Sequence, residues 1–169
     1  LSGGIMQKKP LLIFDFFGVV VEEVAHVWLR ERVASSVADH IISTLFVAVD
    51  EGRVTPEECF VALEEVTKVP AQTIRDEWYA IGKLRADTHK FLIENQDKYH
   101  IVLLSNAGTS FIMPFFTRDN TGHLFLKKFI SSELKMAKPS PEIFEYVLNN
   151  CGVDYSFAVM IDDGIKNIA

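Results

Sequence analysis

The chain has 169 residues and a mass of 19.1 kDa, enough for one domain or for a core with a small inserted module. Hydrophobic residues make up 49% of it and charged residues 24%, which predicts a packed core and excludes a disordered chain. The net charge of −6 argues against nucleic acid as a partner, and no apolar run approaches the roughly 20 residues that cross a bilayer, so no membrane partner is expected.

The start of the chain carries no pattern typical of a signal peptide. Residues 1–5 are interpreted as a cloning remnant ahead of a natural start at Met6. Both cysteines, Cys59 and Cys151, fall in helical patterns without the spacing of a metal site, which favours buried thiols in a reducing compartment. We therefore expect a cytoplasmic protein.

The first predicted element is a strand over Leu11 to Asp15, a short apolar run typical of a parallel strand buried on both faces. Residues 21–85 then show helical periodicity and predict a bundle of three or four helices, with Val24, Val27 and Trp28 on its buried face. Within this block Gly52 suits a helix end, and the segment Thr55 to Glu58 has the pattern of a capping box.

After this block, helices and strands alternate. Asp87 is expected to cap a helix that runs to about Tyr99, and "HIVLLS" (100–105) predicts the next strand. A helix over 108–116, a short strand over 129–131, a helix from Pro141 to Gly152 and a strand over 157–161 follow. This order predicts an α/β fold, a doubly wound parallel sheet with the helical block inserted after the first strand. The core would comprise residues 8–20 and 86–169, and the helical cap residues 21–85.

Polar side chains follow three of the predicted strands at the point where each strand ends. Asp15, the pair Ser105 and Asn106, and the pair Asp162 and Asp163 occupy these positions. Ligands of open α/β sheets bind beyond the carboxyl ends of the strands, so these side chains are expected at one edge of the sheet. Facing carboxylates repel unless a cation lies between them, and Mg²⁺ prefers such oxygen ligands. Lys138, beside a predicted helix start, supplies a point charge for an anion.

Each of these residues alone has an ordinary structural explanation. An Asp after a strand is commonly a turn residue or a helix cap, Ser-Asn is common turn chemistry, and Asp-Asp-Gly is a frequent helix start. A Lys before Pro139 would by itself be a solvated loop charge. Their occurrence together, in this order and at strand ends, favours a functional site.

The ordered set resembles the haloacid dehalogenase-like (HAD) hydrolase superfamily. "IFDFFGVVV" is similar to its first motif, "LLSNA" to its second, "KMAKPSPEIF" to its third and "VMIDDGIKNIA" to its fourth. The resemblance covers the chain from Leu11 onward and includes the small helical cap. Within the superfamily, "DEGRVTPEE", "KPSPEIF" and "DDGIKNI" are most similar to glucose-1-phosphatase-type enzymes and to the phosphatase domain of soluble epoxide hydrolases.

The resemblance implies a phosphatase for a small phosphorylated metabolite, such as a sugar phosphate. Asp15 would be the nucleophile that forms an aspartyl-phosphate, and Ser105, Asn106 and Lys138 would bind the transferring group. Mg²⁺ would lie between Asp15, the carbonyl of Phe17 and Asp163, with Asp162 as a ligand or behind it. Lys135 is nearby, but only Lys138 matches the Lys-Pro pattern.

Phe17 departs from the family pattern, because most phosphatases of the superfamily have an acid at this position. The missing general acid is worth about 10²–10⁴-fold in rate and matters most for poor leaving groups. Glu22, Glu23 or His26 are candidates to replace it. An aromatic residue here is also found in haloacid dehalogenases, so a 2-haloacid dehalogenase is an alternative, although the Asp162–Asp163 pair argues against it. A non-catalytic binding protein on the same scaffold is a third alternative.

The chain ends at Ala169, a few residues into the helix after the fourth motif, whereas family members usually add a further short strand. We therefore expect a C-terminally shortened chain with apolar surface exposed at the sheet edge. The sequence does not indicate an oligomeric state. Phe111, Phe115 and Phe116 are expected to lie in the core rather than at a contact surface.

Overall fold

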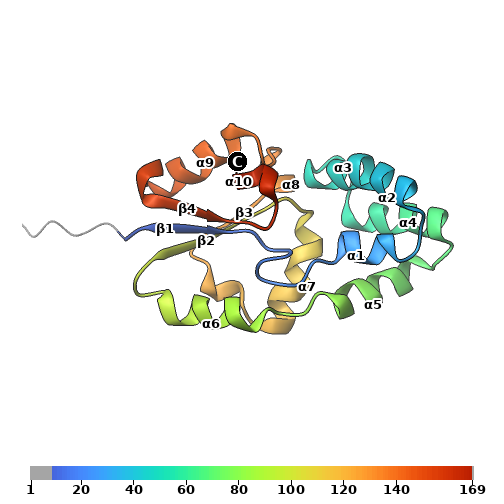
Figure 1. Ribbon diagram of the computed structural model, residues 1–169, viewed down its shortest axis with the longest axis horizontal. Coiled ribbons are helices and arrows are strands. Elements are labelled where there is room, and N and C mark those ends of the chain that lie inside the picture. Colours follow the sequence, from blue (N-terminus) through green and yellow to red (C-terminus); the bar gives the residue numbers. More distant parts are fainter. Residues whose placement is uncertain (1–8, 169) are drawn as a thin grey trace, which may run out of the picture.

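Four short apolar runs form a parallel sheet in the computed structural model, which describes residues 9–168 (Figure 1). The predicted cloning remnant, the start at Met6 and the final residue lie outside the described residues. The strands are arranged in the order β3-β2-β1-β4, and every pair is parallel. Their bounds are β1 (Leu11–Phe14), β2 (His100–Ser105), β3 (Lys128–Ile130) and β4 (Ala158–Ile161).

Successive residues of each strand point to opposite faces of the sheet, and both faces are covered. On one face Leu12 and Phe14 pack with α6 (Ala86–Asn95) and α7 (Thr109–Asp119). On the other face Leu11 and Ile13 pack with α9 (Pro141–Cys151). Figure 1 shows α6 and α7 below the sheet and α9 above it. The predicted doubly wound α/β sheet is therefore confirmed.

A helical block lies at one end of the sheet and connects β1 to α6. Its α4 starts with the predicted capping box of Thr55 and Glu58, and the turn after α3 has Gly52 in the left-handed conformation. The segments α2, η1 and α3 form one continuous helix with a π-helical turn in the middle. The helices of the block are α1 (Ala25–Arg30), α2 (Ser35–Ile41), η1 (Ile42–Phe46), α3 (Val47–Asp50), α4 (Pro56–Thr67) and α5 (Ala71–Ile81).

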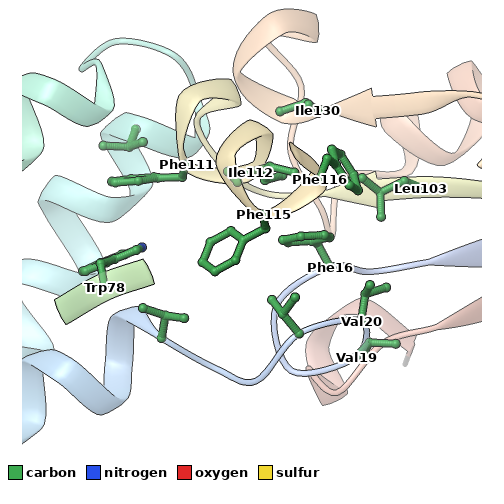
Figure 2. Close-up of a cluster of buried hydrophobic side chains, with 14 of the residues drawn as sticks. Phe16, Val19, Val20, Trp78, Leu103, Phe111, Ile112, Phe115, Phe116 and Ile130 are labelled. Atoms are coloured by element: carbon green, nitrogen blue, oxygen red, sulfur yellow. The ribbon is translucent and has the colours of Figure 1, made fainter. Parts of the chain in front are cut away.

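An aromatic cluster joins this block to the sheet (Figure 2). Trp78 of α5 stacks on Phe111 of α7 with ring centroids 5.1 Å apart, and Phe16, just after β1, packs edge-on against Phe116. All of these side chains are buried, which confirms the predicted core position of the α7 phenylalanines. Burying a large aromatic side chain contributes about 1.5–3 kcal/mol, so this cluster fixes the block firmly against the core.

Three local predictions were wrong. Asp87 does not cap α6, because the Arg85 N–H bonds to the Val20 carbonyl and starts the helix at Ala86, leaving Asp87 inside the first turn. Val27 is 42% exposed, because α1 is only six residues long and buries just the side that carries Trp28. Cys151 is only partly buried because it ends α9 at the rim of the sheet, whereas Cys59 is fully buried.

The short elements at the end of the chain complete the described fold. They are η2 (Gly122–Leu124), α8 (Ser131–Leu134), η3 (Tyr155–Phe157) and α10 (Ile165–Ile168). Around the edge strand β4, Phe157 before the strand, Val159 within it and Ile165 after it are exposed. Across residues 9–168, no helix combines the length and the apolar character needed to cross a membrane.

Candidate active site

Three carboxylates meet at the carboxyl edge of β1 and β4. The two strands are neighbours in register, so Asp15 after β1 lies beside Asp162 and Asp163 after β4. One oxygen from each of them lies within 4.8 Å of the others. The Asp15 N–H donates to the Ile161 carbonyl over 2.9 Å and holds the two strand ends together. Three acids this close repel one another unless cations offset their charge.

Lys138 supplies one such cation from the loop between α8 and α9. Its ammonium lies 3.0 Å from Asp15 Oδ1 and also contacts Asp162, and its side chain is only 1% exposed. Asn106 fixes this loop from both sides, since its Nδ2 donates to the Lys138 carbonyl and its Oδ1 accepts from the Lys138 N–H, each over 2.8 Å. Asn106 therefore positions the backbone of Lys138, and its predicted role in substrate binding stays a prediction.

The adjacent acids Asp162 and Asp163 have different environments. Asp162 is buried and accepts hydrogen bonds from Lys138, from the Gly164 N–H and from Asn167 Nδ2. Asp163 is exposed, and none of the described residues donates to its carboxylate. Asp162 is thus occupied by protein donors, whereas Asp163 is open to a ligand. The sequence did not identify Asn167 as a site residue, because its position five residues after Asp162 indicated only a helix.

Gly18 gives Asp163 the room to approach. Its φ is +79°, and a Cβ added there would lie 2.1 Å from Asp163 Oδ2. Only glycine adopts this conformation readily and leaves this space free. Gly18 is therefore part of the site's geometry.

Ser105 contributes a buried hydroxyl that has no hydrogen-bond partner among the described residues. Leaving a buried polar group unpaired costs about 1–3 kcal/mol, and such groups in a cavity commonly bind a ligand. Ser105 lines the same cavity as Asp15. A hydroxyl donor beside a buried ammonium suits the oxygens of a tetrahedral anion.

Burial sets the electrostatics of Asp15. It raises the pKa of the Asp15 carboxyl from 3.8 to about 6, and the nearby Asp162 charge adds to the rise. Lys138 and the Phe16 N–H, which donates to Asp15 Oδ1 over 2.7 Å, lower the pKa in opposition. A divalent cation at the three carboxylates would lower it further and keep Asp15 ionised. The residues present therefore fit a hard metal ion.

A cavity of about 450 Å³ opens between this edge and the helical block. Its size is typical of sites for small molecules. Of the replacement acids considered above, Glu23 and His26 line the cavity, whereas Glu22 pairs with Arg85 over 3.3 Å. Asp50, Phe46 and Trp78 also line it and were not identified from the sequence. From the core, the lining includes Asp15, Phe17, Ser105, Asn106, Asp162 and Asp163.

The fold and this acidic site place the chain among α/β proteins with a ligand site at the carboxyl edge of a parallel sheet, and comparison with known proteins names the family. Residues 10–169 match the family described as haloacid dehalogenase-like hydrolase. The chain belongs to this family. The resemblance inferred from the four motifs is thereby confirmed.

The individual relatives share only a quarter or less of their residues with this chain. A D-ribitol-5-phosphate phosphatase of Bacteroides thetaiotaomicron is 24% identical over 93% of this chain and 84% of that protein. The structure of a HAD family enzyme from the same organism, in complex with magnesium and inorganic phosphate, is 25% identical with a TM-score of 0.73 over 94% of this chain and 87% of its own. An L-2-haloacid dehalogenase from Xanthobacter autotrophicus has a TM-score of 0.67 at 14% identity, over 96% of this chain and 72% of its own. The last of these shares the fold alone.

Proposed function

We propose that this protein is a Mg²⁺-dependent phosphatase that hydrolyses a small phosphorylated metabolite, such as a sugar phosphate. The observation that carries the proposal is the arrangement of Asp15, Asp162 and Asp163 around the buried Lys138. This set offers a nucleophile, a place for a hard cation and a fixed positive charge at one edge of the sheet. The relatives described as a phosphatase and as a magnesium and phosphate complex support the same chemistry.

In the proposed reaction Asp15 attacks phosphorus and forms an aspartyl-phosphate, which water then hydrolyses. The Lys138 ammonium and the unpaired Ser105 hydroxyl bind oxygens of the transferring group, where negative charge must be stabilised. Asp15, Asp163 and the Phe17 carbonyl would hold Mg²⁺, and Asp162 would orient Lys138 from behind. The metal, when bound, neutralises charge on the phosphoryl group and orients it.

Dehalogenation is the less supported reaction. An anionic haloacid would enter beside Asp163, whose exposed carboxylate repels it in the absence of a metal. Phe17 is the feature that the dehalogenase proposal has in its favour, and it lines the cavity next to Asp15. Both reactions would use Asp15 as the nucleophile, so they must be separated by substrate and by metal dependence.

We also propose a cytoplasmic location, supported by two cysteines that form no disulfide in the described structure. The substrate would then be a metabolite of the cell interior. Labelling of the thiols in freshly lysed cells tests this, because an exported protein would arrive with its partly exposed Cys151 oxidised.

The first experiment measures phosphate release from aryl, acyl and sugar phosphates, with Mg²⁺ and with EDTA. Release that depends on Mg²⁺ and is lost in Asp15→Asn supports the proposal. Halide release from 2-haloacids without metal, and no phosphate release, would instead establish a dehalogenase. Absence of both activities, together with no Mg²⁺ binding by calorimetry, would indicate a binding protein.

A further inference from the structure

We propose that Asp50, on the helical block, is the general acid that protonates the leaving oxygen, in place of the acid that Phe17 does not provide. The inference rests on the phosphatase activity proposed above. Asp50 lines the same cavity as Asp15, Phe17 and Ser105. Neither the family match nor the four motifs assign a role to this residue.

The backbone around Asp50 is fixed to the core. Asp50 is the last residue of α3, and α3 packs against α8, directly after β3. Two residues on, the Gly52 carbonyl accepts a hydrogen bond from Lys135 Nζ over 2.9 Å. A Cβ at Gly52 would lie 2.4 Å from the Ser132 carbonyl, so the turn fits closely against α8. This turn therefore connects the helical block directly to the core that holds Asp15, and it fixes the position of Asp50.

The carboxyl of Asp50 is free to act on a substrate. No hydrogen bond or ion pair among residues 9–168 involves its side chain, whereas the neighbouring Glu51 pairs with Arg53 over 2.6 Å. Glu23 accepts from the His26 N–H over 3.2 Å, and the His26 ring stacks on Phe46. The other two titratable groups that the block contributes to the cavity are thus engaged within the block itself.

The surroundings of Asp50 favour its protonated form. Burial, followed by the negative charge of Asp15, raises the pKa of Asp50 from 3.8 to about 7. The charged and titratable groups around it are Asp15, Lys138, Asp162 and Asp163 from the core, and Glu51, Glu23, His26 and Cys59 from the block. A carboxyl that keeps its proton near neutral pH matches what a general acid requires.

The proton balance of the reaction is complete with this residue. As an Asp15 oxygen bonds to phosphorus, the bond from phosphorus to the leaving oxygen breaks, and that oxygen takes the proton of Asp50. The Asp50 carboxylate then removes a proton from the attacking water, whose oxygen bonds to phosphorus as the bond to Asp15 breaks. Phosphate leaves, and the cycle ends with Asp15 ionised and Asp50 protonated.

The decisive experiment compares leaving groups in Asp50→Asn and in its matched control on the same helical block, Asp39→Asn. With Mg²⁺, Asp50→Asn is expected to lower kcat/KM on a sugar phosphate by about 10²-fold or more, and on acetyl phosphate by about threefold or less. An acyl leaving group needs no proton, so the substitution is expected to affect the two substrates differently. Asp39→Asn is expected to match the wild type on both, because Asp39 is exposed and pairs with Arg30 outside the cavity.

A pH profile of the wild type provides a test that does not depend on a variant folding well. The kcat/KM for the sugar phosphate is expected to fall as pH rises through the raised pKa of Asp50, where its proton is lost, and the kcat/KM for acetyl phosphate is not. The proposal is overturned if kcat/KM shows the same alkaline limb for both substrates, or if Asp50→Asn lowers kcat/KM equally on both or on neither. A wild type that releases no phosphate from any substrate would instead overturn the proposed function, and the role of Asp50 with it.

Discussion

Replacing Lys138 by Met tests whether the buried ammonium holds the three acids together. The side chain is 1% exposed and contacts Asp15 and Asp162. Removing it leaves two buried carboxylates without their cation, a change that typically costs about 3–5 kcal/mol. Because total stabilities are roughly 5–15 kcal/mol, Lys138→Met is expected to lose a large fraction of its free energy of unfolding in metal-free buffer.

The pH dependence of the loss gives its cause. Asp15 has its pKa raised to about 6 even beside Lys138, and removing the ammonium, which lowers that pKa, would raise it further. Ionisation of Asp15 therefore destabilises the fold as pH rises, and the variant is expected to lose most free energy of unfolding above pH 7. Below about pH 4 the carboxyl is protonated in both the folded and the unfolded chain, so the difference between variant and wild type should shrink.

Urea unfolding followed by far-UV circular dichroism is the appropriate assay, because both tryptophans, Trp28 and Trp78, lie in the helical block and would report on that block alone. Lys135→Met is the matched control. Lys135 is exposed and donates only to the Gly52 carbonyl, so its loss should cost about 1 kcal/mol or less. A loss below about 1 kcal/mol in Lys138→Met, or one equal at pH 4 and pH 8, would refute the reasoning.

Further substitutions test other parts of the site. Asp15→Asn should abolish turnover. It should also raise the free energy of unfolding by about 1–3 kcal/mol at pH 8 but not at pH 4 in the same unfolding assay, because it removes an ionisation that opposes folding. Phe17→Asp should leave the Mg²⁺ affinity, measured by calorimetry, near that of the wild type, because this position would bind the metal through its backbone carbonyl. The same substitution should raise turnover of substrates with poor leaving groups, most clearly when it is combined with Asp50→Asn. A fall on every substrate would show that packing of Phe17 on Phe16 and Phe115 dominates. Asn106→Ala should lower kcat more than tenfold by releasing the Lys138 backbone, with a stability loss of about 1–3 kcal/mol, and unchanged kcat would contradict its positioning role.

The sequence predicted the acidic edge because it follows from local patterns. Apolar runs that end in Asp15 and in Asp162 indicate buried parallel strands, and the topology then requires their carboxyl ends to meet. The capping box of α4 and the turn at Gly52 are equally local, and both were predicted. Strand existence and the order of elements were therefore accessible from residue types and spacing alone.

Other features of the site depend on long-range packing and leave no local signal. Asn106 bonds to the backbone of Lys138, 32 residues away, and its Ser-Asn context reads only as a turn. The equivalence of Asp162 and Asp163 in the sequence hides the fact that protein donors occupy one and leave the other open. Asp50 reaches the cavity only because α3 packs on α8, a contact that no spacing within the helical block encodes.

Phe17 occupies the position of the usual acid, and its ring belongs to a chain of aromatic contacts that leads to Asp50, the proposed replacement. Its ring packs on Phe115, which in turn packs on Tyr79 of α5 with centroids 5.1 Å apart. The preceding residue of α5, Trp78, contacts Phe46, at the end of the π-helical turn that runs directly into α3 and Asp50. A carboxylate at position 17 would remove one of the aromatic contacts in this chain, while the contacts of Trp78 with Phe111 and of Tyr79 with Phe115 remain. The aromatic side chain at the position of the usual acid therefore belongs to the packing between the core that carries Asp15 and the helical block that carries Asp50.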